Sequence, residues 1–153
     1  MARPVEIRRA GAAEAPIVAR LLHDFNAEFG EQTPTVEVLT ELTRPLLEGG
    51  EILVFLAGEA DGISLWRLRP SPWTGRPEAY LQELYVVPER RGEGRGRALL
   101  EATMAAAREA GATGIDLNTG ETDAAARALY ESAGFTNLEG PGGPRMLFYE
   151  REL

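Results

Sequence analysis

The chain has 153 residues, of which 26% are charged, and a formal net charge of −8. It contains no cysteine and one histidine, His23, which argues against a disulfide framework, a cysteine nucleophile, a metal centre and a Ser-His-Asp triad. The acidic balance argues against a nucleic-acid-binding protein and favours cationic small molecules as partners.

Hydrophobic periodicity predicts one α/β domain over residues 1–153. The helices expected in chain order are 13–29, 36–47, one that follows the glycine-rich turn and runs to about residue 110, and 122–133. The expected strands are 5–7, 52–57, 63–68, 80–87, 115–118, 135–138 and 145–153. This order predicts a mixed sheet with helices on both faces. No segment has the apolar length of a membrane span and the N-terminus lacks a signal peptide, so we expect a cytoplasmic protein without a membrane partner.

Two faces are expected to be buried. The first helix presents Ile17, Leu21, Leu22 and Phe25, and the second presents Val36, Leu39, Leu42 and Leu46. Pro45 is expected to disturb the end of the second helix.

The most informative stretch is a glycine-rich turn between a buried strand and a helix. Gly92, Gly94 and Gly96 alternate with charged residues after Pro88. Residues without Cβ let the backbone N–H groups approach a ligand, and the following helix start adds free donors and a positive dipole. The four arginines Arg90, Arg91, Arg95 and Arg97 surround the turn, opposed locally by Glu89 and Glu93. The turn therefore predicts a phosphate or pyrophosphate site; the alternative is a solvated surface turn.

Two motifs identify the kind of site. The chain has no lysine, so this is not a P-loop. Arg91-x-x-Gly94-x-Gly96 resembles the coenzyme A pyrophosphate loop of the GNAT acetyltransferase superfamily. The later stretch resembles that superfamily's second signature, with aspartate in place of asparagine: Asp123-x-x-Ala126-x-x-Leu129-Tyr130-Glu131-x-x-Gly134-Phe135.

The resemblance implies a GNAT fold, a mostly antiparallel sheet covered by helices on both faces. It also implies acetyl-CoA as co-substrate, without a metal, and a pantetheine arm held by the backbone near Val86 and Val87 in a gap between strands. The coenzyme-binding residues it implies are Val86, Val87, Arg91, Gly92, Glu93, Gly94, Arg95, Gly96, Arg97, Asn118, Asp123 and Ala126. For Asn118, a turn-forming role is an equal alternative.

Acetyl transfer to an amine needs a base for the ammonium and an acid for the leaving thiolate. Tyr130 lies where the superfamily's general acid lies; the alternative is a packing residue. Glu83 is the best candidate for the base, because it is the carboxylate inside the central strand. A salt-bridged surface carboxylate is the alternative. Glu28 belongs to an acidic stretch expected near the acceptor, or to a solvated acidic face.

A narrower resemblance concerns the loop before the central strand. Pro72-Trp73-Thr74-Gly75-Arg76 and the following 80–86 stretch resemble the spermidine/spermine (diamine) acetyltransferase branch. This implies that Trp73 shapes the acceptor pocket, and that the terminal strand with Met146, Leu147 and Phe148 pairs in a homodimer. Gln82 departs from the branch, which has an acidic residue there.

The sequence thus predicts an acetyl-CoA-dependent N-acetyltransferase that acts on a primary amine of a small cationic molecule, by direct attack in a ternary complex. The alternatives are a protein N-terminal or lysine acetyltransferase and a coenzyme-A-binding regulatory module without turnover.

Overall fold

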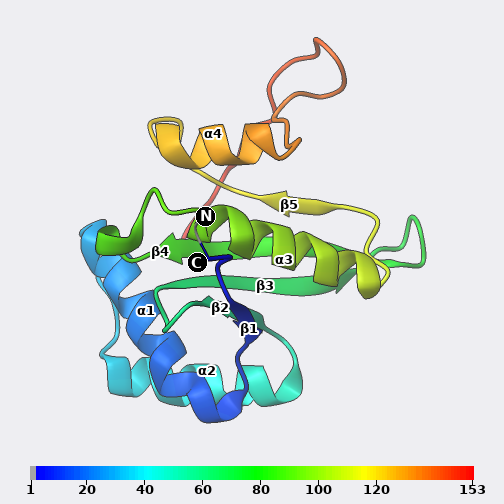
Figure 1. The fold of residues 1–153 in the computed structure, drawn as a ribbon. Coiled ribbons are helices and arrows are strands. Elements are labelled where there is room, and N and C mark those ends of the chain that lie inside the picture. Colours follow the sequence, from blue (N-terminus) through cyan, green and yellow to red (C-terminus); the bar gives the residue numbers. More distant parts are fainter. Residues whose placement is uncertain (1–2) are drawn as a thin grey trace. The chain divides into compact units, whose positions relative to one another are not determined.

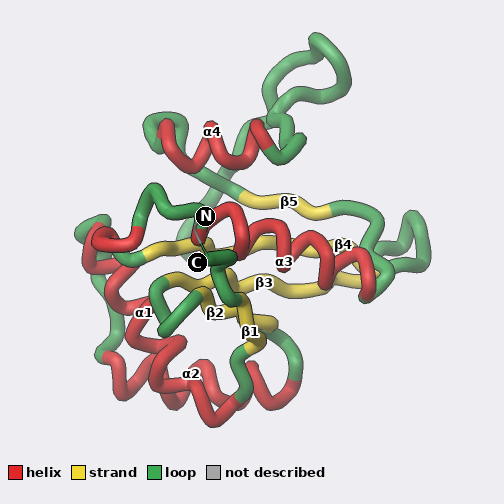
Figure 2. The backbone as a smooth tube through the Cα atoms, in the orientation of Figure 1, coloured by secondary structure: helices red, strands yellow, loops and turns green. Residues whose placement is uncertain are grey.

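The computed structural model describes residues 3–153. By its internal contacts the chain forms two compact units, Met1–Leu117 and Asn118–Leu153, and each is described by itself. Figure 1 labels their elements, and Figure 2 colours helices, strands and loops.

The first unit is built on a five-stranded sheet in the order β1-β2-β3-β4-β5. The strands are β1 Ile7–Arg9, β2 Leu53–Ala57, β3 Gly62–Pro70, β4 Pro77–Val86 and β5 Ile115–Leu117. The first four pair antiparallel, and β4 pairs with β5 in parallel. The predicted mixed, mostly antiparallel sheet is confirmed.

Helices cover both faces of this sheet, as predicted. The helices of the unit are α1 Ala15–Glu28, α2 Val36–Gly49 and α3 Arg95–Glu109, with short 3₁₀ turns η1 Ala12–Glu14 and η2 Pro88–Arg90. On one face, Val18 and Leu21 of α1 join Ile63 and Leu65 of β3 in the core. Ser64 lies between those two strand residues and points to the opposite face, where its hydroxyl is 2.9 Å from the Thr103 hydroxyl of α3.

Details of the helix faces differ from the prediction. Ile17, Leu42 and Leu46 are exposed. The buried residues of α1 are Ala15, Val18, Ala19 and Leu21, so only Leu21 of the predicted face is fully buried. In α2 the buried residue is Thr43, whose hydroxyl bonds to the Leu39 carbonyl 2.8 Å away. Pro45 does not end α2, which continues to Gly49; Pro45 lies on the exposed side of the helix.

The second unit contains α4 Ala124–Ser132. Its N-cap is Asp123, whose carboxylate accepts a hydrogen bond from the Ala126 N–H at 3.1 Å. The strands predicted at 135–138 and 145–153 are wrong: the described residues show a single bridge between Leu138 and Arg145. The glycine- and proline-rich loop 140–144 turns the chain, but pairing stops after the Met146 N–H bonds to the Asn137 carbonyl. A strand without a hydrogen-bonded partner does not persist.

Within residues 3–153, no helix has both the length and the apolar character needed to cross a bilayer.

The buried Ser64–Thr103 contact gives a test of how α3 is held on the sheet. Both residues are fully buried, so Thr103→Val leaves the Ser64 hydroxyl without a partner and should lower the free energy of unfolding by about 1–3 kcal/mol. Thr40→Val is the matched control, because it removes one local bond to the Val36 carbonyl in α2. Urea unfolding measures both variants. If both variants lost the same free energy of unfolding, the Ser64–Thr103 contact would contribute no more to stability than a local bond within one helix.

Candidate active site

The glycine-rich turn leads from β4 into α3. Gly92 and Gly94 have φ angles of +77° and +85°, in the left-handed region that favours glycine. Gly94 is the N-cap of α3, and a Cβ added at Gly92 or Gly94 would meet open space rather than protein. Glycine has no side chain with which to cap the helix, so Gly94 leaves the first N–H groups of α3 without a side-chain cap. This geometry fits an anion such as a pyrophosphate.

Arg90 and Arg95 are held by two carboxylates, Glu93 from the turn itself and Asp61 from a distant part of the chain. Arg95 is largely buried and lies 3.3 Å from Asp61 Oδ2 and 2.6 Å from Glu93 Oε2. Arg90 lies 3.7 Å from each of the same two carboxylates. Asp61, in the β2–β3 turn, was not found by sequence reasoning because no local pattern links it to a turn about thirty residues later. The predicted surplus of positive charge is therefore largely compensated inside the unit.

Arg91 makes contacts with both α1 and β4. Its Nη2 donates to both oxygens of Glu28 at 2.7 and 2.8 Å, and its Nε donates to the Val86 carbonyl at 2.9 Å. Its guanidinium lies 5.6 Å from the centre of the Tyr85 ring, which stacks on Phe25. The end of α1 is thus tied to the turn through Arg91, and Glu28, a predicted acceptor-side residue, lies beside the coenzyme-side motif.

Tyr85 was not singled out by sequence reasoning. It is buried on the α1 face of β4. Burial first, and the negative charge of Glu28 second, raise the pKa of its hydroxyl. Tyr85 therefore keeps its proton at neutral pH and supports the Arg91–Glu28 pair as a neutral aromatic surface. The signal for its burial was the continuous apolar run Leu84–Val87.

Glu83 lies at an irregularity in the ladder. Leu65 pairs with Glu83 while the next residue, Trp66, pairs with Leu81, so Gln82 is an extra residue on β4. Such bulges redirect side chains and are common beside active sites. Burial raises the pKa of Glu83, and a hydrogen bond from Gln82 opposes the rise. A carboxylate with a raised pKa is suited to accept a proton near neutral pH.

The second half of β4 has one free edge. β5 pairs with β4 over Ala79–Leu81 only, so among the described residues no strand pairs with the Gln82–Val86 part of β4 on that side. Two backbone groups at its end are already used: the Val86 carbonyl accepts from Arg91, and the Val87 N–H donates to the Asp61 carbonyl at 2.9 Å. The remaining backbone groups of this edge are those that an extended ligand can meet.

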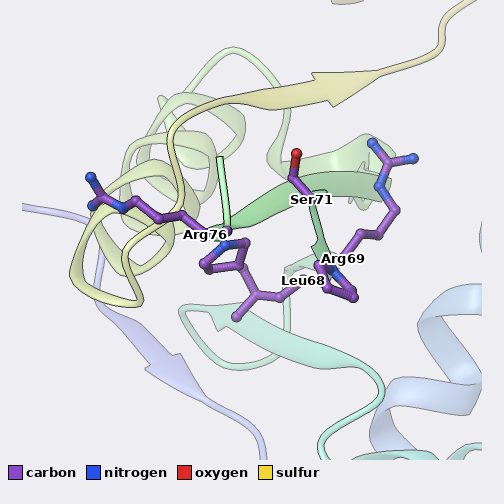
Figure 3. A pocket seen from close by; sticks show the side chains of 7 residues that line it. Leu68, Arg69, Ser71 and Arg76 are labelled. Carbon is purple, nitrogen blue, oxygen red and sulfur yellow. The ribbon is translucent and has the colours of Figure 1, made fainter. Parts of the chain in front are cut away.

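Trp73 is not brought to Glu83. It is 91% exposed in the β3–β4 loop, whereas Glu83 lies six residues beyond the start of β4 at Pro77, or about 20 Å along the strand. Beside this loop is an open pocket of about 410 Å³ (Figure 3), lined by Leu68, Arg69, Pro70, Ser71, Gly75, Arg76 and Pro77. The pocket is therefore at the opposite end of β4 from the glycine-rich turn.

In the second unit, the structure places Tyr130 on α4. Tyr130 is buried, and its ring lies 5.8 Å from that of Phe135. Asp123 and Ala126 bond to one another at the start of α4, and Asn118 follows directly after β5.

Comparison with known proteins agrees with this geometry. The model of the acetyltransferase (GNAT) family matches residues 18–135. Aminoglycoside N(6')-acetyltransferase type 1 of Stenotrophomonas maltophilia is 34% identical over 140 residues, covering 87% of each chain. The crystal structure of an Arthrobacter sp. FB24 protein is 44% identical, with a TM-score of 0.91 over 100% of this chain and 99% of that one.

A more distant structure shares the fold alone. It is the aminoglycoside acetyltransferase meta-AAC0020 from an uncultured soil metagenomic sample, which is 21% identical with a TM-score of 0.79 over 97% of this chain and 95% of that one.

A sheet with helices on both faces and an open glycine-rich turn at a helix start define an acyl-CoA-dependent transferase. The chain belongs to the GNAT family of N-acetyltransferases. Members of this family use acetyl-CoA as co-substrate, and the open, positive helix start at Gly94 suits its pyrophosphate.

Gly94 gives a direct test of the turn. Gly94→Glu places bulk and negative charge in the open space of the turn, so acetyl-CoA should no longer raise the melting temperature of the variant. Gly111→Glu is the matched control, because Gly111 follows the other end of α3 with a similar φ of +90°. Both variants carry comparable backbone strain, and only the control should keep the shift. A folded Gly94→Glu protein with the parental shift would move the coenzyme site elsewhere.

Proposed function

We propose that this protein transfers the acetyl group of acetyl-CoA to a primary amine of a small molecule that arrives as an ammonium cation. The observation that carries the proposal is Glu83, a carboxylate whose pKa is raised by burial, at a bulge in the strand that leads into the glycine-rich turn. The amine attacks the thioester carbonyl directly in a ternary complex, without an acetylated protein, since the chain has no cysteine to carry the group.

In this mechanism each proton has a named destination. Glu83 takes a proton from the ammonium, directly or through water, which frees the nitrogen lone pair. The nitrogen forms a bond to the acetyl carbon as the carbon–sulfur bond breaks. Tyr130 gives its proton to the departing thiolate, and the second proton that the nitrogen loses as the amide forms returns through water to the Tyr130 oxygen. The turn at Gly92–Gly94, Arg95, Gly96 and Arg97 holds the coenzyme, while Glu28 holds Arg91 beside that turn.

The identity of the acceptor is the open part of the proposal. A relative that acts on aminoglycosides favours a small-molecule amine, and the loop around Trp73 resembles the diamine branch. The exposure of Trp73 within one chain argues against its lining the site of that same chain. Acetylation of protein amines and coenzyme binding without turnover remain the alternatives. Measuring the release of free thiol from acetyl-CoA with a panel of small amines and with peptides separates the three. Release with small amines supports the proposal, release with peptides alone supports protein acetylation, and no release supports binding without turnover.

Glu83→Gln tests the base. Parent kcat/KM should fall as pH falls through the raised pKa of Glu83, because the protonated carboxyl accepts nothing. The amide variant has no base at any pH, so its activity should recover only as the free amine appears, near the amine's own pKa of about 10. Glu78→Gln is the control, since Glu78 lies on the same strand away from the turn. Overlapping pH profiles of parent and Glu83→Gln would exclude Glu83 as the base.

Tyr130→Phe tests the acid. The hydroxyl donates to charge that develops mainly in the transition state, so kcat should fall by about 10²- to 10⁴-fold while acetyl-CoA binding stays near parental. Tyr149→Phe is the matched control because Tyr149 is exposed. Steady-state kinetics and coenzyme titration measure both. A parental kcat would make Tyr130 a packing residue, and lost coenzyme binding would make it a binding residue.

We also propose a homodimer, on the exposure of Met146, Leu147 and Phe148 near the C-terminus. Apolar side chains in a row favour burial against another surface. Light scattering at micromolar concentration should give twice the mass of one chain, and Leu147→Glu with Phe148→Glu should give one. A monomeric parent would exclude the dimer.

A further inference from the structure

The inference concerns Arg67, which neither motif includes, and the chemical class of the acceptor. It starts from the register of β3 and β4. Leu65 pairs with Glu83, and Arg67 pairs with Tyr80. Directly opposed residues share a face, and residues two apart on the regular strand β3 also share one. Arg67 and Glu83 therefore project from the same face of the sheet, the face that carries Leu65 and Tyr85 in the core.

Arg67 is half-buried, and its Nε is shielded from solvent without a hydrogen-bond partner. Within residues 3–153 its side chain makes no ion pair. A shielded donor without a partner is costly. Such a donor calls for an explanation, and a bound ligand is one.

The neighbouring carboxylates do not complete it. Asp116 lies opposite Tyr80 and so shares the row of Arg67, but its Oδ2 is bound by Arg69 Nη2 at 2.5 Å. Arg69 also covers the Tyr80 ring at 5.3 Å. Glu83 is not neutralised by Arg67 either, because its pKa is raised by burial and opposed only by the Gln82 hydrogen bond. The sheet face therefore carries one cationic and one anionic group, each without a partner of opposite charge.

Their separation suits a small molecule. Diagonal neighbours in a regular antiparallel pair are about 7–8 Å apart, within reach of long side chains, and the extra residue Gln82 changes this spacing locally between Arg67 and Glu83. An ammonium near Glu83 and a carboxylate near Arg67 would satisfy both groups with one ligand, and guanidinium–carboxylate pairing is the strongest of such contacts.

We propose that the acceptor is an amine that also carries a carboxylate, of the amino-acid class, with its carboxylate bound by Arg67. This rests on the proposed function, in which Glu83 receives the proton of the ammonium. Arg67 is thus a substrate-binding residue that determines specificity, and it takes no part in proton transfer. Polyamines and aminoglycosides lack the carboxylate and leave Arg67 unsatisfied.

The test uses pairs of amines that differ by the carboxylate alone: glycine with methylamine, β-alanine with ethylamine, and 4-aminobutyrate with propylamine. Spermidine and sisomicin serve as polycations. With parent protein and acetyl-CoA, at least one carboxylate-bearing amine should exceed its counterpart in kcat/KM by about 10- to 100-fold. The three carboxylate-bearing amines differ in the length of the chain between nitrogen and carboxylate, so the one with the largest preference indicates the spacing between Arg67 and Glu83.

Three variants test whether Arg67 causes the preference for carboxylate-bearing amines. Arg67→Met should remove the preference by raising KM for the carboxylate-bearing amine more than for its carboxylate-free counterpart, and should leave the melting temperature near parental because Arg67 is only half-buried. Arg67→Lys should restore part of it. Arg69→Met is the control and should keep it, because Arg69 is exposed and already paired with Asp116.

The outcomes separate the inference from the function on which it rests. Acetylation of amines without a carboxylate preference, a preference that survives in Arg67→Met, or faster turnover of spermidine or sisomicin than of every carboxylate-bearing amine would overturn the role of Arg67 and leave the acetyltransferase standing. Equal losses for both members of a pair with a lower melting temperature would show a structural role instead. No thiol release with any amine, in a protein that acetyl-CoA still stabilises, would remove the proposed function and this inference together.

Discussion

The pairing of β4 is the constraint on which the rest of the first unit depends. β4 pairs with β3 along its whole length, but with β5 only over Ala79–Leu81. Its second half therefore keeps one edge of backbone donors and acceptors free beside Glu83. Pro88 ends the strand because it has no N–H to contribute, and the glycine-rich turn follows at once. An unpaired strand edge next to an open helix start is suited to a long ligand with an anionic end.

The bulge at Gln82 adjusts this strand. One extra residue on β4 places Leu81 opposite Trp66 and Glu83 opposite Leu65, so Glu83 rather than Gln82 lies opposite Leu65 on the buried α1 face. Burial without a cationic partner then raises its pKa. The same face carries Tyr85, Arg67 and Tyr80, so these residues and Glu83 lie along one side of β3 and β4.

The arginines around the turn form ion pairs with carboxylates of the protein, which leaves the backbone at the start of α3 to meet an anionic ligand. Arg90 and Arg95 are held by Asp61 and Glu93, and Arg91 holds Glu28 and the Val86 carbonyl. These guanidinium groups fix the shape of the turn, while Gly94 gives the N–H groups at the start of α3 no side-chain cap. Fixed dipoles cost no reorganisation when an anion binds, whereas a paired arginine must first release its carboxylate.

The sequence by itself determined the elements of the first unit, the turn, and the family, because periodicity, glycine spacing and the motif around Tyr130 are local patterns. Only the tertiary structure decided which groups are paired. Strand register and helix packing bring Asp61 and Glu28 to their arginine partners and leave Arg67 without a carboxylate among the described residues. A single extra residue such as Gln82 changes that register. The two C-terminal strands were predicted from composition, but a strand forms only where a partner edge is present, and after Met146 none of the described residues supplies one. Local propensity depends on residues that are neighbours in the sequence, whereas charge pairing and strand pairing depend on residues that are distant in it.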